Sequence, residues 1–242
     1  MIDLHSHILP AIDDGARHLD DTLLLAKQAV EQGVTHMVCT PHVHVGRFDN
    51  SREIIANAFN DTLECLQAQN VNLKLSYASE VRTCIEITQW HQSGALCYLG
   101  QWKDKKALLL EMPHSHVPTG IERLIHWLLQ QNVQPIIPHP ERNRDILAQP
   151  DKALWLKRMG VVFQATAGAF TGTFGEQVEH LAWQMLEENL IAYVASDMHN
   201  LNKRPNEMAQ AYKIIAEKHS EHRATDLFVT TPLHITRDTL WQ

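Results

Sequence analysis

The chain has 242 residues, of which 44% are hydrophobic and 20% are charged, as in an ordinary soluble globular protein. Its formal net charge of −7 argues against a nucleic-acid surface, which needs clustered Lys and Arg. No apolar run approaches the roughly 18 residues that span a bilayer, and the N-terminus lacks the basic region of an export signal. We therefore expect a cytoplasmic protein with no nucleic-acid partner and no membrane insertion, built as one α/β domain over residues 1–242.

The four cysteines form no Cys-x-x-Cys pair and fall inside apolar or helical patterns, which indicates reduced thiols. A cysteine-based tyrosine phosphatase needs an arginine six positions after its nucleophile. The residues six positions after the cysteines are Val45, Val71, Trp90 and Lys103. The sequence also lacks a Gly-x-Ser-x-Gly elbow and a phosphate loop, which excludes the common serine hydrolases and nucleoside triphosphatases.

The first apolar run places His5 and His7 two positions apart. Alternate side chains of an extended strand share one face, so both imidazoles are expected to point the same way. Asp13 and Asp14 follow in the next loop and could complete half of a metal site. Asp-Asp-Gly is also an ordinary turn signal, and one histidine could instead face the core, so the interpretation requires further ligands.

The next segment predicts a βαβ unit. Apolar residues recur at helical spacing from Leu19 to Val30, and Gly33 stands just past the end of that helix. The buried run 34–39 then leads directly to His42, as a strand followed by a loop would.

Two pairs of residues have the spacing of a helix-capping box, Asn50 with Glu53 and Thr119 with Glu122. Each predicts the start of a helix. The strand predicted after the first helix ends at Glu80. Residues 81–102 are less regular and suggest a short helix and a loop, and the strand 106–110 ends at Glu111.

The remaining predicted strands each lead into a distinctive segment. Strand 133–137 leads to His139, strand 161–165 leads to a loop rich in Gly and Thr, and strand 190–195 leads to Asp197. Helices are expected from 176 to 188 and from Pro205 onward. We expect the last twenty residues to form a strand or a tail that packs on the fold.

Strand after strand thus terminates in a side chain that can bind a metal ion. In a parallel barrel the carboxyl ends of the strands converge on one face, so these residues predict a single metal centre. The alternative is that they are unrelated turn or surface residues. The other histidines fit helix surfaces or loops, although His44 and His114 lie nearest to the predicted centre in the sequence. The convergent residues are His5, His7, His42, Glu80, Glu111, His139, Asp197 and His199.

These motifs resemble the polymerase-and-histidinol-phosphatase (PHP) superfamily over residues 1–215. Within it, the chain most resembles the bacterial manganese-dependent protein tyrosine phosphatases associated with capsule and exopolysaccharide tyrosine kinases. The resemblance implies a distorted (β/α)7 TIM-like barrel that holds three divalent metal ions. The motifs are His5-Ser-His7, Asp13-Asp14-Gly15, Thr40-Pro-His42, Glu80, Glu111, Pro138-His-Pro-Glu-Arg142, Gln164 with the loop after it, and Ser196-Asp-Met-His-Asn200.

The resemblance also implies roles for individual residues. Asp13 remains an alternative to Asp14 as a ligand, and Arg142 and Arg204 would contact phosphate. Nitrogen and oxygen ligands of this kind are compatible with Mn²⁺, Fe²⁺ or Zn²⁺, and the resemblance implies Mn²⁺. The implied ligands are His5, His7, Glu80 and Asp197 for one ion, Glu80, Glu111 and His139 for a second, and Asp14, His42 and His199 for a third.

The implied reaction is hydrolysis of phosphotyrosine on a protein, with a bacterial tyrosine kinase controlling capsule synthesis as the expected partner. The hypothesis is direct in-line attack on phosphorus by a hydroxide that bridges the metal ions. Three alternatives stay open. One is a small-molecule phosphatase of the histidinol-phosphate type, and another is an amidohydrolase, although this chain has Glu80 and Glu111 where such enzymes usually rely on a lysine. The third is a non-catalytic metal-binding regulatory module.

Overall fold

The computed structural model describes residues 1–242 and contains ten strands in two mostly parallel sheets. One sheet has the order β1-β2-β4, and the other has the order β10-β9-β8-β7-β5-β3, with β6 antiparallel to β7. The strands are β1 (Ile2–Ser6), β2 (His36–Cys39), β3 (His42–Val43), β4 (Lys74–Tyr77), β5 (Glu80–Arg82), β6 (Gly100–Trp102), β7 (Lys105–Glu111), β8 (Val133–Pro138), β9 (Val162–Thr166) and β10 (Ile191–Ala195).

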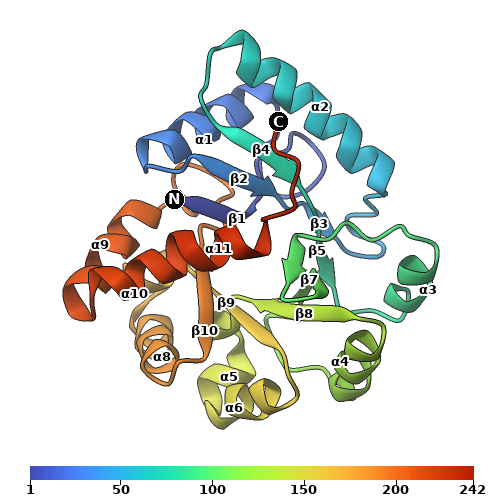
Figure 1. The fold of residues 1–242 in the computed structure, drawn as a ribbon, viewed down its shortest axis with the longest axis vertical. Coiled ribbons are helices and arrows are strands. Elements are labelled where there is room, and N and C mark those ends of the chain that lie inside the picture. The colour runs from blue at the N-terminus through green and yellow to red at the C-terminus, as the bar shows by residue number, and fades with distance from the viewer.

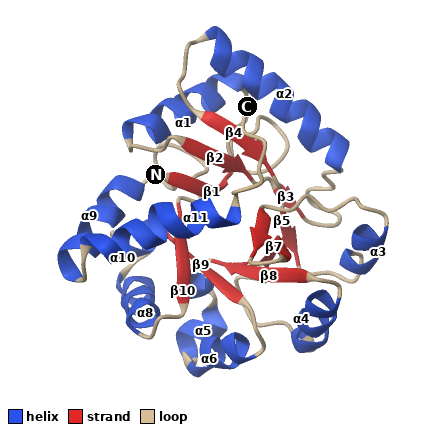
Figure 2. Ribbon diagram, in the orientation of Figure 1, coloured by secondary structure: helices blue, strands red, loops and turns tan.

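The helices surround the strands, which lie in the centre of the molecule (Figures 1 and 2). The principal helices are α1 (Leu19–Glu31), α2 (Arg52–Ala68), α3 (Ile87–Gln92), α4 (Ile121–Gln130), α5 (Arg144–Ala148), α6 (Asp151–Arg158), α7 (Ala167–Phe170), α8 (Glu176–Glu187), α9 (Met208–Lys218), α10 (Glu221–Thr225) and α11 (Thr231–Ile235). The chain also contains a 3-10 helical turn, η1 (Pro140–Arg142), and a π-helical turn, η2 (Asp226–Thr230). None of these helices is both long enough and apolar enough to cross a bilayer.

The two sheets meet at the end of β1. Ser6 forms an isolated parallel bridge with Met198, just past β10, and the amide of Asp197 donates to the carbonyl of His5 at 2.8 Å. On the other side, β3 and β5 follow β2 and β4 after only a few residues, so two chain segments pass from one sheet to the other. Strand pairing therefore establishes an α/β fold of two joined parallel sheets, and it does not by itself show a closed barrel.

Inward-facing side chains of both sheets form a common apolar core. Leu4, Val38, Leu109, Ile136 and Tyr193 come from five strands and are fully or almost fully buried. Alternation of side chains along each strand puts these residues on one face and leaves the other face to pack against the helices. The two sheets therefore share an interior, and their strand ends lie at common edges.

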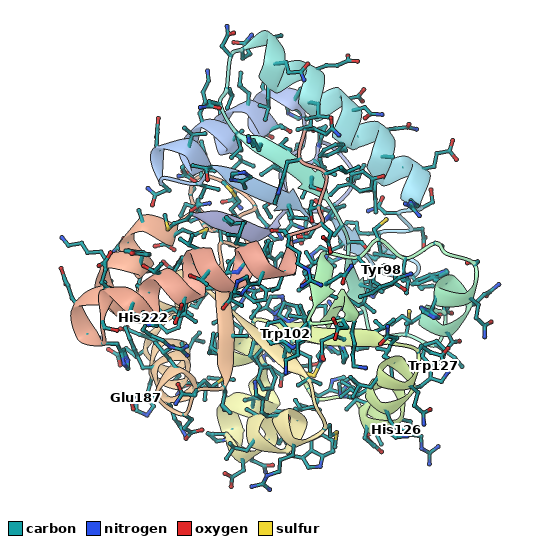
Figure 3. All side chains as sticks on the ribbon, in the orientation of Figure 1. Tyr98, Trp102, His126, Trp127, Glu187 and His222 are labelled. Carbon is teal, nitrogen blue, oxygen red and sulfur yellow. The ribbon has the colours of Figure 1, made fainter.

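The C-terminal segment covers one end of this interior. Ile235 belongs to the same apolar cluster, and Trp102 and Trp241 pack against it. Helix α11 crosses in front of the central strands in Figure 1, and Trp102 is labelled near the centre of Figure 3. The final residue, Gln242, exchanges two backbone hydrogen bonds with Leu75 of β4.

The prediction for these last residues was wrong in part, because Phe228 lies in a helical turn and no strand forms there. The β-branched sequence around it resembles a strand. However, the buried residues Ala224, Leu227, Phe228 and Ile235 recur at helical spacing, and Pro232 is tolerated in the first turn of α11. Burial of one helical face therefore outweighed local β propensity.

Both capping-box predictions were also wrong, although the helices exist. The N-cap of α2 is Ser51, whose hydroxyl accepts from the amide of Ile54, while the N-cap of α4 is Gly120 with no side-chain cap. Asn50 instead donates its side-chain amide to the backbone carbonyls of Ile12 and His42. Helix α9 begins at Met208, three residues after the predicted Pro205.

The backbone of Gly100 in β6 passes so close to α11 that no side chain fits at this position. Its φ is +142°, and a Cβ added there would lie 2.2 Å from the carbonyl oxygen of Ile235. We expect Gly100→Ala to lower the free energy of unfolding by about 2 kcal/mol or more, since strain and a backbone clash add. Urea unfolding checks this. Gly94→Ala is the matched control, because Gly94 also has positive φ but nothing within 4 Å, and an equal loss in both variants would contradict the clash.

Candidate metal centre

The strand ends bring all the predicted ligands into one pocket. His5 lies in β1 and His7 directly follows that strand, and their Nε2 atoms are 3.1 Å apart with both residues fully buried. The strand predicted to end at Glu80 is interrupted, because β4 ends at Tyr77 and Glu80 opens the short strand β5 that continues its path. Glu111 closes β7, and His139 follows β8, where its Nε2 lies 2.8 Å from a Glu80 oxygen. Parallel pairing places successive strand ends at the same edge, which is why residues distant in sequence meet here.

Four overlapping groups of side chains could each hold a metal ion. Within each group, one possible ligand atom from every residue lies within 4.8 Å of the others. These groups place His139 with His5 and Asp197, and its Nε2 also lies 2.8 Å from Glu80. The family resemblance implies Glu80 and Glu111 as its partners. His42 is shared by two groups, and Glu80 is also shared by two. The groups are His7, Asp14, His42 and His199; His5, His7 and Glu80; His5, His139 and Asp197; and His42, Glu80 and Glu111.

Two neighbouring polar side chains orient the paired histidines. Gln164 places its carbonyl oxygen 2.7 Å from Nδ1 of His5, and Asp13 places a carboxylate oxygen 2.7 Å from Nδ1 of His7. Each contact holds the Nδ1 proton and leaves Nε2 directed at the centre. Asp13 and Asp14 thus occupy different positions, because Asp14 instead lies 3.3 Å from His42 and 3.4 Å from His199.

The buried charges strongly perturb one another. Burial alone would lower the pKa of His42, but the adjacent carboxylate of Glu80 raises it to about 10. Burial, reinforced by the charge of Glu80, raises the pKa of Glu111 to about 7. Burial lowers the pKa of His139 to about 3 and that of His199 to about 4, so both are neutral near pH 7. Neutral imidazole is the form that binds metal ions.

Four buried polar atoms at the centre have no well-formed hydrogen bond, and they are Glu80 Oε2, Glu111 Oε2, Asp197 Oδ1 and His199 Nε2. Each lies 2.8 to 3.4 Å from an ionisable side chain, but without hydrogen-bond geometry. Buried carboxylate oxygens without good partners are costly in a protein interior. Because these atoms belong to the four groups and are chemically metal ligands, the residues fit a set of divalent cations.

Both predicted arginines lie at this cluster. Arg142 and Arg204 each donate to Oδ2 of Asp197, the latter at 2.5 Å. Burial would raise the pKa of Asp197, but these two guanidinium groups and His5 hold it well below its usual range. The ring of Phe174 lies 4.5 Å from the guanidinium carbon of Arg142 and supports that side chain.

Sequence reasoning missed three supporting residues. Arg82 lies 3.1 Å from Glu111, Phe48 stacks on His42 at 5.6 Å, and Phe174 contacts Arg142. Arg82 could have been found, because it stands two positions after Glu80 on the same strand face. The two aromatic contacts come from loops and carry no sequence spacing that would reveal them.

The structure distinguishes His114 from His44, the two other histidines that lie nearest to the predicted centre in the sequence. His114 stacks on His139 with ring centroids 5.4 Å apart, and its Nε2 lies 3.9 Å from Glu111. It therefore borders the cluster without joining any of the four groups. His44 makes its backbone hydrogen bonds across the turn to Phe48.

A family model for capsular polysaccharide synthesis, CpsB/CapC, matches residues 1–237. The chain belongs to the CpsB/CapC family. Tyrosine-protein phosphatase YwqE of Bacillus subtilis is 34% identical over 90% of this chain and 85% of its own length. Tyrosine-protein phosphatase CpsB of Streptococcus pneumoniae is 30% identical over 99% of this chain and its whole length.

Solved structures agree with the CpsB/CapC assignment. One solved structure is described with YwqE and CpsB as metal-dependent tyrosine phosphatases, and it superposes on this chain with a TM-score of 0.91. The two chains are 32% identical, and the match covers 100% of this chain and 97% of the other. A β-aspartyl dipeptidase from Fervidobacterium islandicum has a TM-score of 0.62 at 14% identity, covering 97% of this chain and 72% of its own. The dipeptidase match shows the fold alone.

The contribution of the contact between Phe174 and Arg142 can be tested by substitution. We expect Phe174→Leu to lower kcat/KM for an aryl phosphate by about twofold to thirtyfold, because an interaction of about 0.5–2 kcal/mol with Arg142 is lost. Steady-state kinetics measures this. Phe174→Tyr keeps an aromatic ring and is expected to stay near the wild-type value. Equal kinetics for the leucine variant, at equal metal content, would contradict a supporting role.

The raised pKa of His42 predicts proton release on metal binding. In metal-stripped protein at pH 7, His42 is protonated because its pKa is about 10, and Glu111 is partly protonated because its pKa is about 7. A cation must displace these protons, so apparent affinity rises as pH rises through 7. Titration calorimetry with Mn²⁺ in buffers of different ionisation enthalpy is expected to report release of about one proton or more. Binding without proton release would disprove the assignment of His42 and Glu111.

Proposed function

We propose that this chain is a metal-dependent phosphatase that hydrolyses phosphotyrosine on a protein. The observation that carries the proposal is a buried His and carboxylate cluster bordered by two arginines, in a member of a family whose relatives are tyrosine-protein phosphatases. Burial raises the pKa of the Cys39, Cys84 and Cys97 thiols, so none of these three is an activated thiolate near pH 7.

The chain's own residues bind and orient the phosphate in this proposal. Arg142 and Arg204 meet at one carboxylate oxygen of Asp197, so their remaining donors can clamp phosphoryl oxygens next to the cluster. Gln164 and Asp13 keep His5 and His7 in a single tautomer. These contacts preorganise the site before substrate arrives.

We assign the nine ligands to three divalent cations, with Mn²⁺ as the ion and Fe²⁺ or Zn²⁺ as alternatives. Four overlapping groups that share His5, His7, His42 and Glu80 support adjacent cations rather than one isolated ion. When bound, divalent cations lower the pKa of water and offset charge on phosphoryl oxygens. The proposed ligands are His5, His7, Asp14, His42, Glu80, Glu111, His139, Asp197 and His199.

The fold proposal is a single domain over residues 1–242 built on a distorted seven-stranded barrel. Treating β2 with β3 and β4 with β5 as continuous segments gives seven strands in a ring, with the Ser6 to Met198 bridge as the closing contact. The shared apolar core of both sheets supports this arrangement.

The proposed partner is a bacterial tyrosine kinase that controls capsule or exopolysaccharide synthesis, and the proposed location is the cytoplasm. The family's description as capsular polysaccharide synthesis supports the process. The names of the Bacillus and Streptococcus relatives support phosphotyrosine as the substrate. A histidinol-phosphate type enzyme would use the same metals, so the substrate comparison decides between them.

Metal removal tests the function. Chelation is expected to abolish turnover of a phosphotyrosine peptide, and Mn²⁺ is expected to restore it. His139→Ala is expected to lower kcat at least about 100-fold through loss of a ligand. His126→Ala, an exposed histidine on α4, is the matched control and is expected to leave kcat unchanged. Turnover that survives chelation, or faster hydrolysis of histidinol phosphate than of the peptide, would refute the proposal.

A further inference from the structure

A cavity of about 550 Å³ opens beside the metal centre. Its walls are the loop after β1, helix α1 and the loop after β10, and two cluster residues, Asp14 and His199, line it. A second cavity of about 220 Å³ beside Phe48 contains no residue of the four ligand groups. The larger cavity is therefore directly continuous with the cluster.

The loop after β10 is held in one conformation. The side-chain oxygen of Asn200 accepts from the backbone amides of Asn202, Lys203 and Arg204, at 3.2, 2.7 and 3.3 Å. The amide of His199 donates to the carbonyl of Arg204 at 2.9 Å. The backbone at Lys203 is thus fixed relative to a proposed ligand and to a phosphate-binding arginine.

The cavity wall carries three aspartates and two cations, and one of these cations, Lys203, is unpaired. Lys203 is exposed and has no carboxylate within 4.0 Å, while Arg17 pairs with Asp21 through Nε at 3.3 Å. The two other acidic residues of the wall are engaged elsewhere. Asp13 contacts His7, and Asp14 faces His42 and His199.

Two leucines give the same cavity an apolar side. Leu24 of α1 is 50% exposed and Leu201 is 39% exposed, although large apolar side chains are usually buried. An open cavity with aliphatic side chains, amide groups and an unpaired cation matches an extended peptide that carries an acidic side chain.

We propose that this cavity binds the peptide segment next to the phosphotyrosine and selects an acidic neighbour through Lys203, with Arg17 as a second cation. This inference rests on the proposed phosphatase function, because the phosphate must lie at the cluster. The aliphatic part of the peptide lies against Leu24 and Leu201. A small aryl phosphate needs the cluster but not the contacts with Lys203, Leu24 and Leu201.

Matched phosphotyrosine peptides test the proposal on the Mn²⁺-loaded protein. The peptides differ only in having Glu, Gln or Lys at positions within two residues of the phosphotyrosine, on either side. We expect wild-type kcat/KM to be about threefold to tenfold higher for a Glu peptide than for its Lys counterpart. High salt is expected to reduce this ratio towards one, because exposed charges are screened.

The variant Lys203→Glu is expected to abolish or reverse that preference, and Arg17→Gln to reduce it. Both are expected to hydrolyse p-nitrophenyl phosphate within about twofold of wild type, because rim charges act mainly on the peptide. Lys74→Glu, an exposed residue at the start of β4 and therefore at the opposite strand ends, is the control and is expected to keep the preference.

An unchanged peptide preference in Lys203→Glu would overturn the proposal, and so would an equal loss in Lys74→Glu. A wild-type protein that hydrolyses all three peptides equally would also overturn it. Failure of the phosphatase function itself looks different, since neither the peptides nor p-nitrophenyl phosphate would be hydrolysed. The small substrate also reports whether each variant is folded.

Discussion

Carboxylates buried in one pocket repel one another unless positive charge lies between them, and this constraint governs the centre of the molecule. The charge of Glu80 adds to burial in raising the pKa of Glu111 to about 7. Arg142 and Arg204 keep Asp197 ionised, and His42 retains a proton beside Glu80. Cations at the centre would replace these protons and relieve the same repulsion. The arrangement is therefore built around positive charge, and the fold has to hold it in place.

The fold holds the centre in place through hydrogen bonds at the strand ends. Asp3, fully buried in β1, accepts from the amides of His5 and Ser196 and from the side chain of Asn206. These hydrogen bonds join β1 to the segment after β10. The two segments lie near opposite ends of the sequence, and both carry proposed ligands. Rigid strands with supporting hydrogen bonds position ligands more accurately than loops do.

The sequence was sufficient to predict that the candidate metal-binding side chains converge, because side-chain alternation and strand ends are local patterns. It was not sufficient to distinguish Asp13 from Asp14, since that depends on how one loop folds against His7. Helix positions were predictable from apolar spacing, but Ser51 and Gly120 replaced the expected caps. The support of Arg142 by Phe174 and the helical C-terminal segment depend on tertiary packing, which leaves no fixed spacing in the chain.

In the proposed function, chemistry and substrate selection depend on different side chains of the same short loop. His199 and Arg204 contact the cluster, and Lys203 lines the adjacent cavity, which His199 also borders. The Asn200 turn fixes the backbone of this loop. Only the backbone amide of Lys203 takes part in that turn, so the charge at position 203 can change without moving His199 or Arg204. Such an arrangement allows relatives with one cluster to prefer different phosphoproteins, since the peptide-binding wall can vary while the ligands stay in place.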